Sequence, residues 1–186
     1  MVAVLLVIRS GLPASDARWK FAAPVCSKLL DSFLHLLKKS PAGAVFNPWW
    51  EVDEQNDAAR IAPAIRRNQL RAYLQKRLGK VKLTIIGEAL GYRGGHFTGI
   101  PMTSERILLG KKKDDCIEPK DVFSSIKPRR TSKTASCLDG FYEPTATIVW
   151  GHTPPAWRGT KRIRSVERLP VAFIRSTSRH IEQPHT

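Results

Sequence analysis

The sequence predicts one α/β domain in a chain of 186 residues. Apolar residues recur at helical spacing over 25–39 and 63–78, and the apolar run 81–86 is typical of a buried strand. A glycine-rich loop over 87–105 follows that strand and leads into a short helix over 103–109. Since α/β folds build sites for polar ligands where a strand turns into a helix, this loop is the first candidate for a functional site.

The chain divides into three parts. Residues 1–24 form an N-terminal extension of uncertain role, in which the apolar run 2–8 is either a strand or an artefact of the chosen start codon. That run lacks a basic flank and is too short to cross a bilayer, so neither a signal peptide nor a membrane anchor is expected. Residues 25–150 form the α/β domain, and 151–186 form a basic tail without regular periodicity.

Two helices precede the strand. The helix over 25–39 ends where the segment 41–43, with its proline and glycine, breaks the pattern. Pro63 suits the first turn of the second helix, and Gly79 suits its end. In this second helix we expect the apolar residues to face the core and the basic residues to face solvent. The first set is Ile65, Leu70, Tyr73, Leu74 and Leu78, and the second is Arg66, Arg67, Arg71, Lys76 and Arg77.

The segment 46–53 between the helices predicts an aromatic-rich loop. Asn47 and Asp53 are interpreted as turn residues, because their short polar side chains readily hydrogen-bond nearby backbone groups. Trp49 and Trp50 are interpreted as a hydrophobic lid on the core rather than as a platform for a ligand.

Positive charge is the most unusual property of the composition, with 31 Lys+Arg against 16 Asp+Glu and a net charge of +15. Such a surplus repels itself in a compact fold and favours a polyanionic partner. Nucleic acid is favoured over a membrane surface as that partner, because the sequence contains no long basic amphipathic helix. Two basic clusters lie in a long polar loop predicted over 111–133, ahead of a helix that starts near Glu143. They are either solvated charges or phosphate contacts.

Cysteine usage argues against a disulfide framework and against metal sites. The three cysteines, Cys26, Cys116 and Cys137, are odd in number and widely spaced. We therefore expect idle thiols in a reducing compartment, a cytoplasmic protein, and neither a metal ion nor a cofactor.

The glycine-rich loop reads Gly-Glu-Ala-Leu-Gly-Tyr-Arg-Gly-Gly-His-Phe-Thr-Gly-Ile-Pro-Met over 87–102. It resembles the first motif of the uracil-DNA glycosylase superfamily, in the branch that carries Gly-Glu-Ala-Pro-Gly and then Gly-x-Pro-Phe. Bacterial members of that branch have an Asn-Pro-Trp loop and an Arg-rich helix upstream, which 47–49 and 65–74 match. The resemblance covers about residues 45–150.

This resemblance implies a three-layer α/β/α sandwich with a short parallel sheet. It also implies a monomeric DNA repair protein of base excision repair that flips a damaged base out of the duplex. Water then hydrolyses the N-glycosidic bond without a metal and leaves an abasic site.

The resemblance also implies roles for single residues of the loop. Backbone groups of Glu88 and Ala89 would meet the carbonyl edge of uracil and help to place the attacking water, which makes them the candidate catalytic residues. Gly91 matches a position that stays small beside the base, and Met102 matches the aromatic residue on which uracil stacks. The candidate substrate-binding residues are Gly87, Gly91, Tyr92, Gly99, Pro101 and Met102, and the candidate DNA-binding residues are Arg93, Lys111, Lys112, Lys113, Arg129 and Arg130.

Simpler interpretations exist for several of these residues. Tyr92 and Arg93 either bind DNA or pack within the loop, and Glu88 without the surrounding motif would be a turn cap. His96 is expected to be a solvent-exposed loop residue. The sequence also departs from the family pattern, because Leu90 replaces a proline and Met102 replaces the stacking aromatic.

Two further motifs of the family do not occur in the given reading frame. One is a strand like Trp-Asn-Ala-Phe-Pro, whose Asn reads the uracil edge, and the other is a His-bearing loop near the C-terminus. Codons for 166–173 can be chosen so that a reading shifted by one base gives Trp-Asn-Ala-Phe-Pro. Our hypothesis is that residues from about Gly151 onward are translated out of frame, which leaves the fold incomplete at its C-terminus.

The expected function is therefore that of a uracil-DNA-glycosylase-like protein whose chain is weakly active or inactive. The first alternative is a non-catalytic nucleic-acid-binding protein that keeps the scaffold. The second is a degenerate product that does not fold stably and melts without cooperativity.

Overall fold

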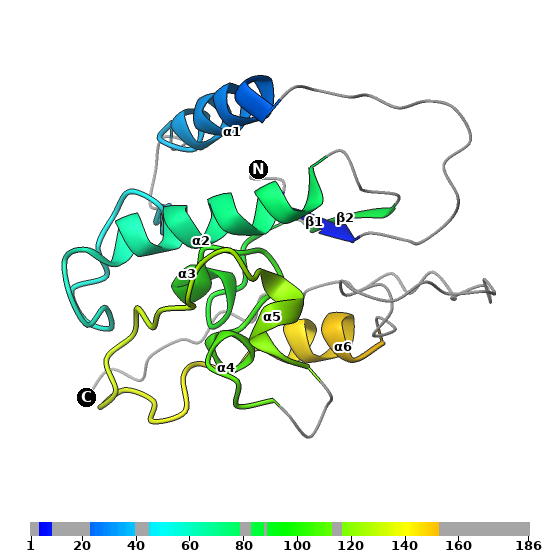
Figure 1. The fold of residues 1–186 in the computed structure, drawn as a ribbon. Helices are drawn as coiled ribbons and strands as arrows, with labels where there is room; N and C mark the ends of the chain where they lie inside the picture. The colour runs from blue at the N-terminus through cyan, green and yellow to red at the C-terminus, as the bar shows by residue number, and fades with distance from the viewer. Residues whose placement is uncertain are drawn as a thin grey trace.

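The computed structural model describes residues 4–8, 23–39, 45–78, 83–87, 89–112 and 117–152 (Figure 1). Apart from 151 and 152, the tail predicted over 151–186 lies outside the described residues. The elements follow one another as β1 (Val4–Ile8), α1 (Ala23–Leu36), α2 (Ala62–Arg77), β2 (Leu83–Gly87), α3 (Gly95–Thr98), α4 (Glu105–Leu108), α5 (Pro119–Val122) and α6 (Pro144–His152).

The two described strands pair with each other. Both are short runs of mainly apolar residues, and their backbone N–H and C=O groups pair over five residues, with Val4 opposite Gly87 and Ile8 opposite Leu83. The strand expected over 81–86 is thus confirmed as β2. This pair is antiparallel. The short parallel sheet expected within 25–150 stays a prediction. A three-layer sandwich stays a prediction, and most of the regular structure described is helical.

The helices expected over 25–39, 63–78 and from 143 onward are confirmed as α1, α2 and α6. The glycine-rich loop contains an unexpected single turn of helix, α3, and the helix expected over 103–109 is the shorter α4. The polar segment 111–133 was expected to be a loop throughout, which is wrong at α5. There Pro119 begins the helix, and Glu118 and Asp121 satisfy its first backbone groups as a capping box.

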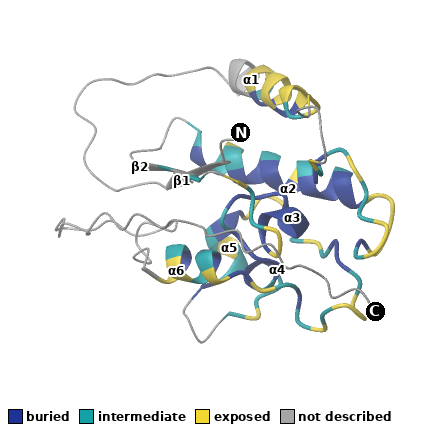
Figure 2. Cartoon of the chain, turned by 180° about the vertical axis from the view of Figure 1, so that it is seen from behind, coloured by how far each residue is buried: buried dark blue, intermediate teal, exposed yellow. Residues whose placement is uncertain are grey.

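Helix α2 occupies the middle of the described fold. In two opposite views α1 lies on one side of α2, and α3 to α6 lie on the other side (Figures 1 and 2). Tyr73 of α2 is fully buried, and the core continues through Ile100, Ile107 and Phe123. By contrast, α1 buries only Leu30 and Leu34 among its described side chains, so most of its surface is exposed in Figure 2.

Arg66 corrects the expectation that the basic residues of α2 face solvent. Its side chain and that of Asp57 are both 0% exposed, and the guanidinium meets the carboxylate through two contacts of 2.7 and 2.8 Å. The remaining donors reach the carbonyl oxygens of Pro48 and Glu51. A buried charge is tolerated only when it is paired and hydrogen-bonded, so Arg66 fixes the segment 47–57 against α2.

Arg77 is also buried, at the C-terminal end of α2. Its guanidinium lies 3.8 Å from the centre of the Tyr73 ring and donates to the carbonyl oxygens of Asp121 and Val122. Lys76 reaches the same end of α5 through the Asp121 carbonyl. The last carbonyls of a helix lack partners within it, so these two cations complete the end of α5. Both residues were expected to face solvent, because charge alone does not reveal a carbonyl partner.

Glu105, the first residue of α4, joins that helix to the segment 131–132. It is 1% exposed, and one carboxyl oxygen accepts the backbone N–H groups of Thr131 and Ser132 at 2.9 and 3.1 Å. Ser132 in turn forms an isolated bridge with Asp57. The carboxyl group of Glu105 and the ion pair of Arg66 therefore belong to one connected polar network.

We predict that Asp57→Asn lowers the free energy of unfolding by about 3–5 kcal/mol, because it leaves the Arg66 charge buried without its counter-ion. Urea denaturation of the full chain measures this value. Asp31→Asn is the matched control, since Asp31 pairs with Arg71 on an exposed surface. That variant should melt nearly as the parent does. Equal, small effects of the two substitutions would contradict a structural role for the buried pair.

Candidate functional site: the glycine-rich loop

The glycine-rich loop leaves β2 at Gly87 and presents its first part to solvent. Glu88 lies outside the described residues. Ala89 and Arg93 are exposed, and Tyr92 is 73% exposed. The loop is closed on itself because the Gly91 carbonyl accepts the backbone N–H groups of Gly94 and His96. These exposed groups are thus carried by a compact turn rather than by an extended strap.

The second part of the loop, Gly99 to Met102, is packed on α2. Gly99 has φ +73°, and a Cβ there would lie 2.7 Å from both the Cβ and the carbonyl oxygen of Arg66, so only glycine fits. Its carbonyl accepts the Trp49 indole N–H at 2.9 Å. Pro101 is buried, whereas Met102 is half-buried with φ +48°. Trp49 acts as a lid, as expected, and it also ties the loop down.

His96 is not the exposed residue that was expected. It is 7% exposed and stacks on the Phe46 ring, with the ring centres 4.5 Å apart. Its Nε2 lies 3.1 Å from Oδ2 of Asp53. Burial lowers the pKa of His96 below its usual value, and the Arg66 charge lowers it further, although Asp53 opposes both effects. We therefore assign a neutral imidazole that donates from Nε2, which makes this contact a hydrogen bond rather than an ion pair.

Asp53 holds both a turn and the loop. Its Oδ1 accepts the backbone N–H groups of Gln55 and Asn56, which is the turn role expected of it. Burial favours the neutral acid, but the hydrogen bonds from Asn56 and the contact with His96 outweigh it and hold the pKa of Asp53 below its usual value. Asp53 thus links the segment before α2 to α3.

Glu143, at the start of α6, is a buried carboxyl that lies against the loop. It is 8% exposed, and a Cβ on Gly91 would lie 2.0 Å from its Oε1. A Cβ on Gly94 would lie 1.4 Å from its Oε2. The carboxyl group therefore fills the space that these two glycines leave. No signal in the sequence distinguished this residue from an ordinary helix-start glutamate before a proline.

The electrostatic surroundings of Glu143 favour its neutral form. Burial raises the pKa of Glu143, and a hydrogen bond from the Gly95 backbone opposes this effect only in part. Among the described residues, Oε2 has no hydrogen-bond partner and no cation pairs with the carboxyl group. A buried carboxyl without a counter-ion is best accommodated as the uncharged acid.

The structure describes five of the six predicted DNA-binding cations. Arg93, Lys111 and Arg129 are exposed, although Lys111 lies 3.4 Å from Asp139. Arg130 instead donates to backbone carbonyls, including those of Ser132 and Leu138, so its guanidinium is used within the fold. Lys112 lies over the Tyr142 ring, and Lys113 is outside the described residues. Of the five predicted cations that the structure describes, three are therefore exposed.

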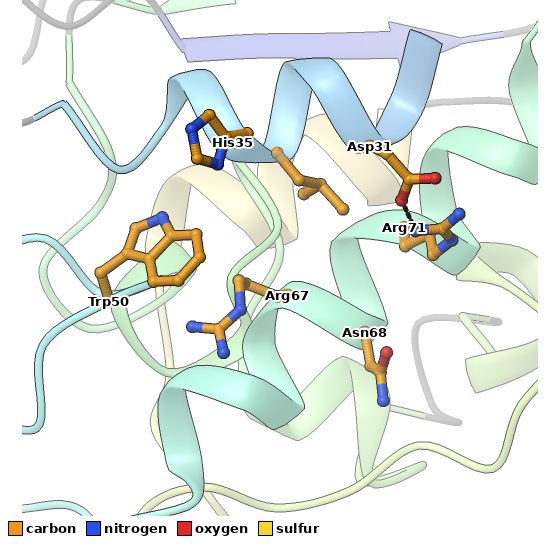
Figure 3. Close-up of a pocket in the computed structure, with 7 residues that line it drawn as sticks. Asp31, His35, Trp50, Arg67, Asn68 and Arg71 are labelled. Carbon is orange, nitrogen blue, oxygen red and sulfur yellow. Dashed lines mark hydrogen bonds and ion pairs between the residues drawn. The ribbon is translucent and has the colours of Figure 1, made fainter. Parts of the chain in front are cut away.

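A groove of about 250 Å³ lies elsewhere, between α1 and α2 (Figure 3). Asp31 and His35 come from α1, and Arg71 of α2 closes one end by pairing with Asp31. Arg67 lies over the Trp50 ring, 4.1 Å from its centre. No residue of the glycine-rich loop lines this groove, so it is separate from the candidate site.

Comparisons with known proteins add no assignment, because no protein-family model, curated protein or solved structure matches this chain. In the part of the chain that the structure describes, no group of three or more His, Cys, Asp or Glu residues could hold a metal ion. None of the described helices is both long enough and apolar enough to cross a membrane.

We predict that the contribution of His96 to the free energy of unfolding falls as the pH is lowered from 7 to 5, because His96 must be protonated against its burial. A histidine with a lowered folded pKa contributes stability above its unfolded pKa of about 6.5, and this stability is lost at lower pH. His96→Gln should reduce that loss in urea denaturation at the two pH values. His35→Gln, which removes an exposed imidazole from α1, should leave it unchanged. An identical acid loss in His96→Gln would refute the assignment.

Proposed function

We propose that this chain is a uracil-DNA-glycosylase-like protein that binds DNA and an extruded base at the glycine-rich loop. The observation that carries the proposal is the form of this loop. The first part of the loop exposes Ala89, the ring of Tyr92 and the cation of Arg93. The second part is held down where the Trp49 indole donates to the Gly99 carbonyl. Such a turn offers fixed backbone dipoles next to groups that stack on bases and bind phosphate.

The reaction class is hydrolysis of an N-glycosidic bond. A water oxygen would bond to the sugar C1′ while the bond from C1′ to the base nitrogen breaks. The base would leave with the bonding electron pair, and the proton that the water loses would end on the released base. Backbone groups at 88–89 would stabilise the negative charge that develops on the leaving base. Met102 would pack on the base through its polarizable side chain. The chain lacks the family's Asn strand and His loop in the given reading frame, so we expect little or no turnover.

The alternative is a nucleic-acid-binding protein without catalysis, and one observation favours it. The resemblance places a base beside Gly91, whereas the carboxyl group of Glu143 lies where the Cβ of that residue would point. A protein that keeps the exposed cations but cannot admit a base would bind DNA without removing anything from it.

We predict that the purified chain binds duplex DNA with an affinity that falls steeply with salt. Three exposed cations correspond to a slope of about −3 for log K against log salt concentration. Arg93→Ala should reduce the magnitude of this slope by about one, as measured by fluorescence anisotropy. Lys28→Ala removes the same charge from the exposed surface of α1, on the other side of α2, and should leave the slope unchanged.

A duplex with one U·G mismatch separates the two candidate functions. The glycosylase-like protein should bind it about tenfold tighter than the matched duplex, with at most traces of abasic product after alkali treatment. Equal affinities would favour the non-catalytic alternative. Efficient uracil excision would overturn the expectation of a weak or inactive chain, and binding that is insensitive to salt would sink both candidates.

A further inference from the structure

Two glycines of the candidate loop lie against the side chain of one distant residue. Gly91 and Gly94 lie about fifty positions before Glu143, yet the three nearest atoms to an added Cβ at either glycine all belong to the Glu143 side chain. At Gly91 these are the two oxygens and the carbon of the carboxyl group. Gly94 has φ −113°, so a left-handed backbone does not explain its glycine.

We propose that Glu143 is the positioning residue of the glycine-rich loop: its carboxyl group fills the space between Gly91 and Gly94 and holds this turn, with its exposed Tyr92 and Arg93, in one shape. The side chain acts through the loop and not on a ligand, because its carboxyl oxygen Oε2 is buried. The proposal rests on the proposed function only in treating the loop as the DNA-binding site.

Two contacts fix the carboxyl group where it lies. The Gly95 backbone N–H donates a hydrogen bond to it, and Gly95 is the first residue of α3. Glu143 itself immediately precedes α6, and its backbone carbonyl accepts the Thr147 N–H at 3.2 Å. Further along α6, the indole N–H of Trp150 donates to the Met102 carbonyl at 3.0 Å. Helix α6 therefore contacts both ends of the loop.

If Glu143 positions the loop, the stability of the loop should depend on pH through the protonation of the Glu143 carboxyl group. Tyr92, Arg93 and His96 are the titratable side chains of the described loop and α3, and none of them forms an ion pair with Glu143. Because burial raises the pKa of the carboxyl group, its contribution to stability is complete below the unfolded pKa of about 4.5. It is lost as the pH rises through the folded pKa. Ionisation at higher pH should therefore loosen the loop.

Hydrogen exchange of the backbone amides of 91–96 tests the proposal at pH 4.5 and 8.0, with rates corrected for intrinsic exchange. In the parent chain the protection of the Gly95 amide should fall by about tenfold or more over this interval. Glu143→Gln is neutral and nearly isosteric, so it should keep the protection at both pH values. Glu143→Ala should lose it at both. Glu54→Gln removes an exposed carboxylate and is the matched control, which should follow the parent chain.

A double-mutant cycle measures the same contact without a change of pH. Gly91→Ala alone should destabilise the chain, because the new methyl group meets the carboxyl group of Glu143. In the presence of Glu143→Ala the same substitution should cost much less, which gives a favourable coupling. Additive effects, or a Glu143→Ala chain whose loop is as protected as that of the parent, would overturn the proposal.

Affinity for the U·G duplex distinguishes the failure of this proposal from the failure of the proposed function. Positioning predicts that the preference for U·G weakens at pH 8.0 in the parent chain but not in Glu143→Gln. A preference that is present but insensitive to Glu143 refutes the positioning role and leaves the proposed function intact. Absence of any preference, together with the expected exchange pattern, refutes the proposed function and leaves the positioning role intact.

Discussion

The buried ion pair between Arg66 and Asp57 is the constraint on which the rest of the described fold depends. A guanidinium without access to water needs a counter-ion and a partner for each donor, and here they come from Asp57, Pro48 and Glu51. This requirement closes the segment 47–57 onto α2. The Asp57 bridge to Ser132 then carries the same constraint to the Glu105 carboxyl group. Replacing either ion alone would leave the other buried and uncompensated.

The candidate loop is held in place by the polar network around Arg66 and Asp57. Gly99 passes directly over Arg66, and the Trp49 indole binds its carbonyl, so the second part of the loop follows the buried pair. The first part is held by two carboxyl groups in different states. Asp53 has a lowered pKa and binds His96, whereas Glu143 has a raised pKa and lies against glycine. The exposed ring and cation of the loop are therefore supported from within by one ionised carboxyl group, Asp53, and one whose neutral form is favoured, Glu143.

Some of the positive charge stabilises the fold, and the rest is exposed and available to a partner. Composition alone does not separate these two parts. Some guanidinium groups bind carboxylate or carbonyl oxygens within the fold, namely those of Arg66, Arg77 and Arg130. Arg93 and Arg129 remain exposed, as do several lysines. The surplus available to a polyanion is therefore smaller than the formal net charge of +15 suggests. Arginine suits these interior positions because its planar guanidinium group can donate to several acceptors at once.

Local pattern determined the helices α1, α2 and α6 and the strand β2, because spacing of apolar residues and the positions of proline and glycine act over a few residues. The sequence also determined the turn role of Asn47, whose carboxamide oxygen accepts the Trp49 N–H. Only the tertiary structure decided that Arg66 and His96 are buried and that Glu143 meets Gly91 and Gly94. These facts depend on partners 9 to 52 positions away, and a side chain's burial and protonation follow from what packs around it. The roles of Glu88 and Ala89 were inferred from the resemblance and stay predictions.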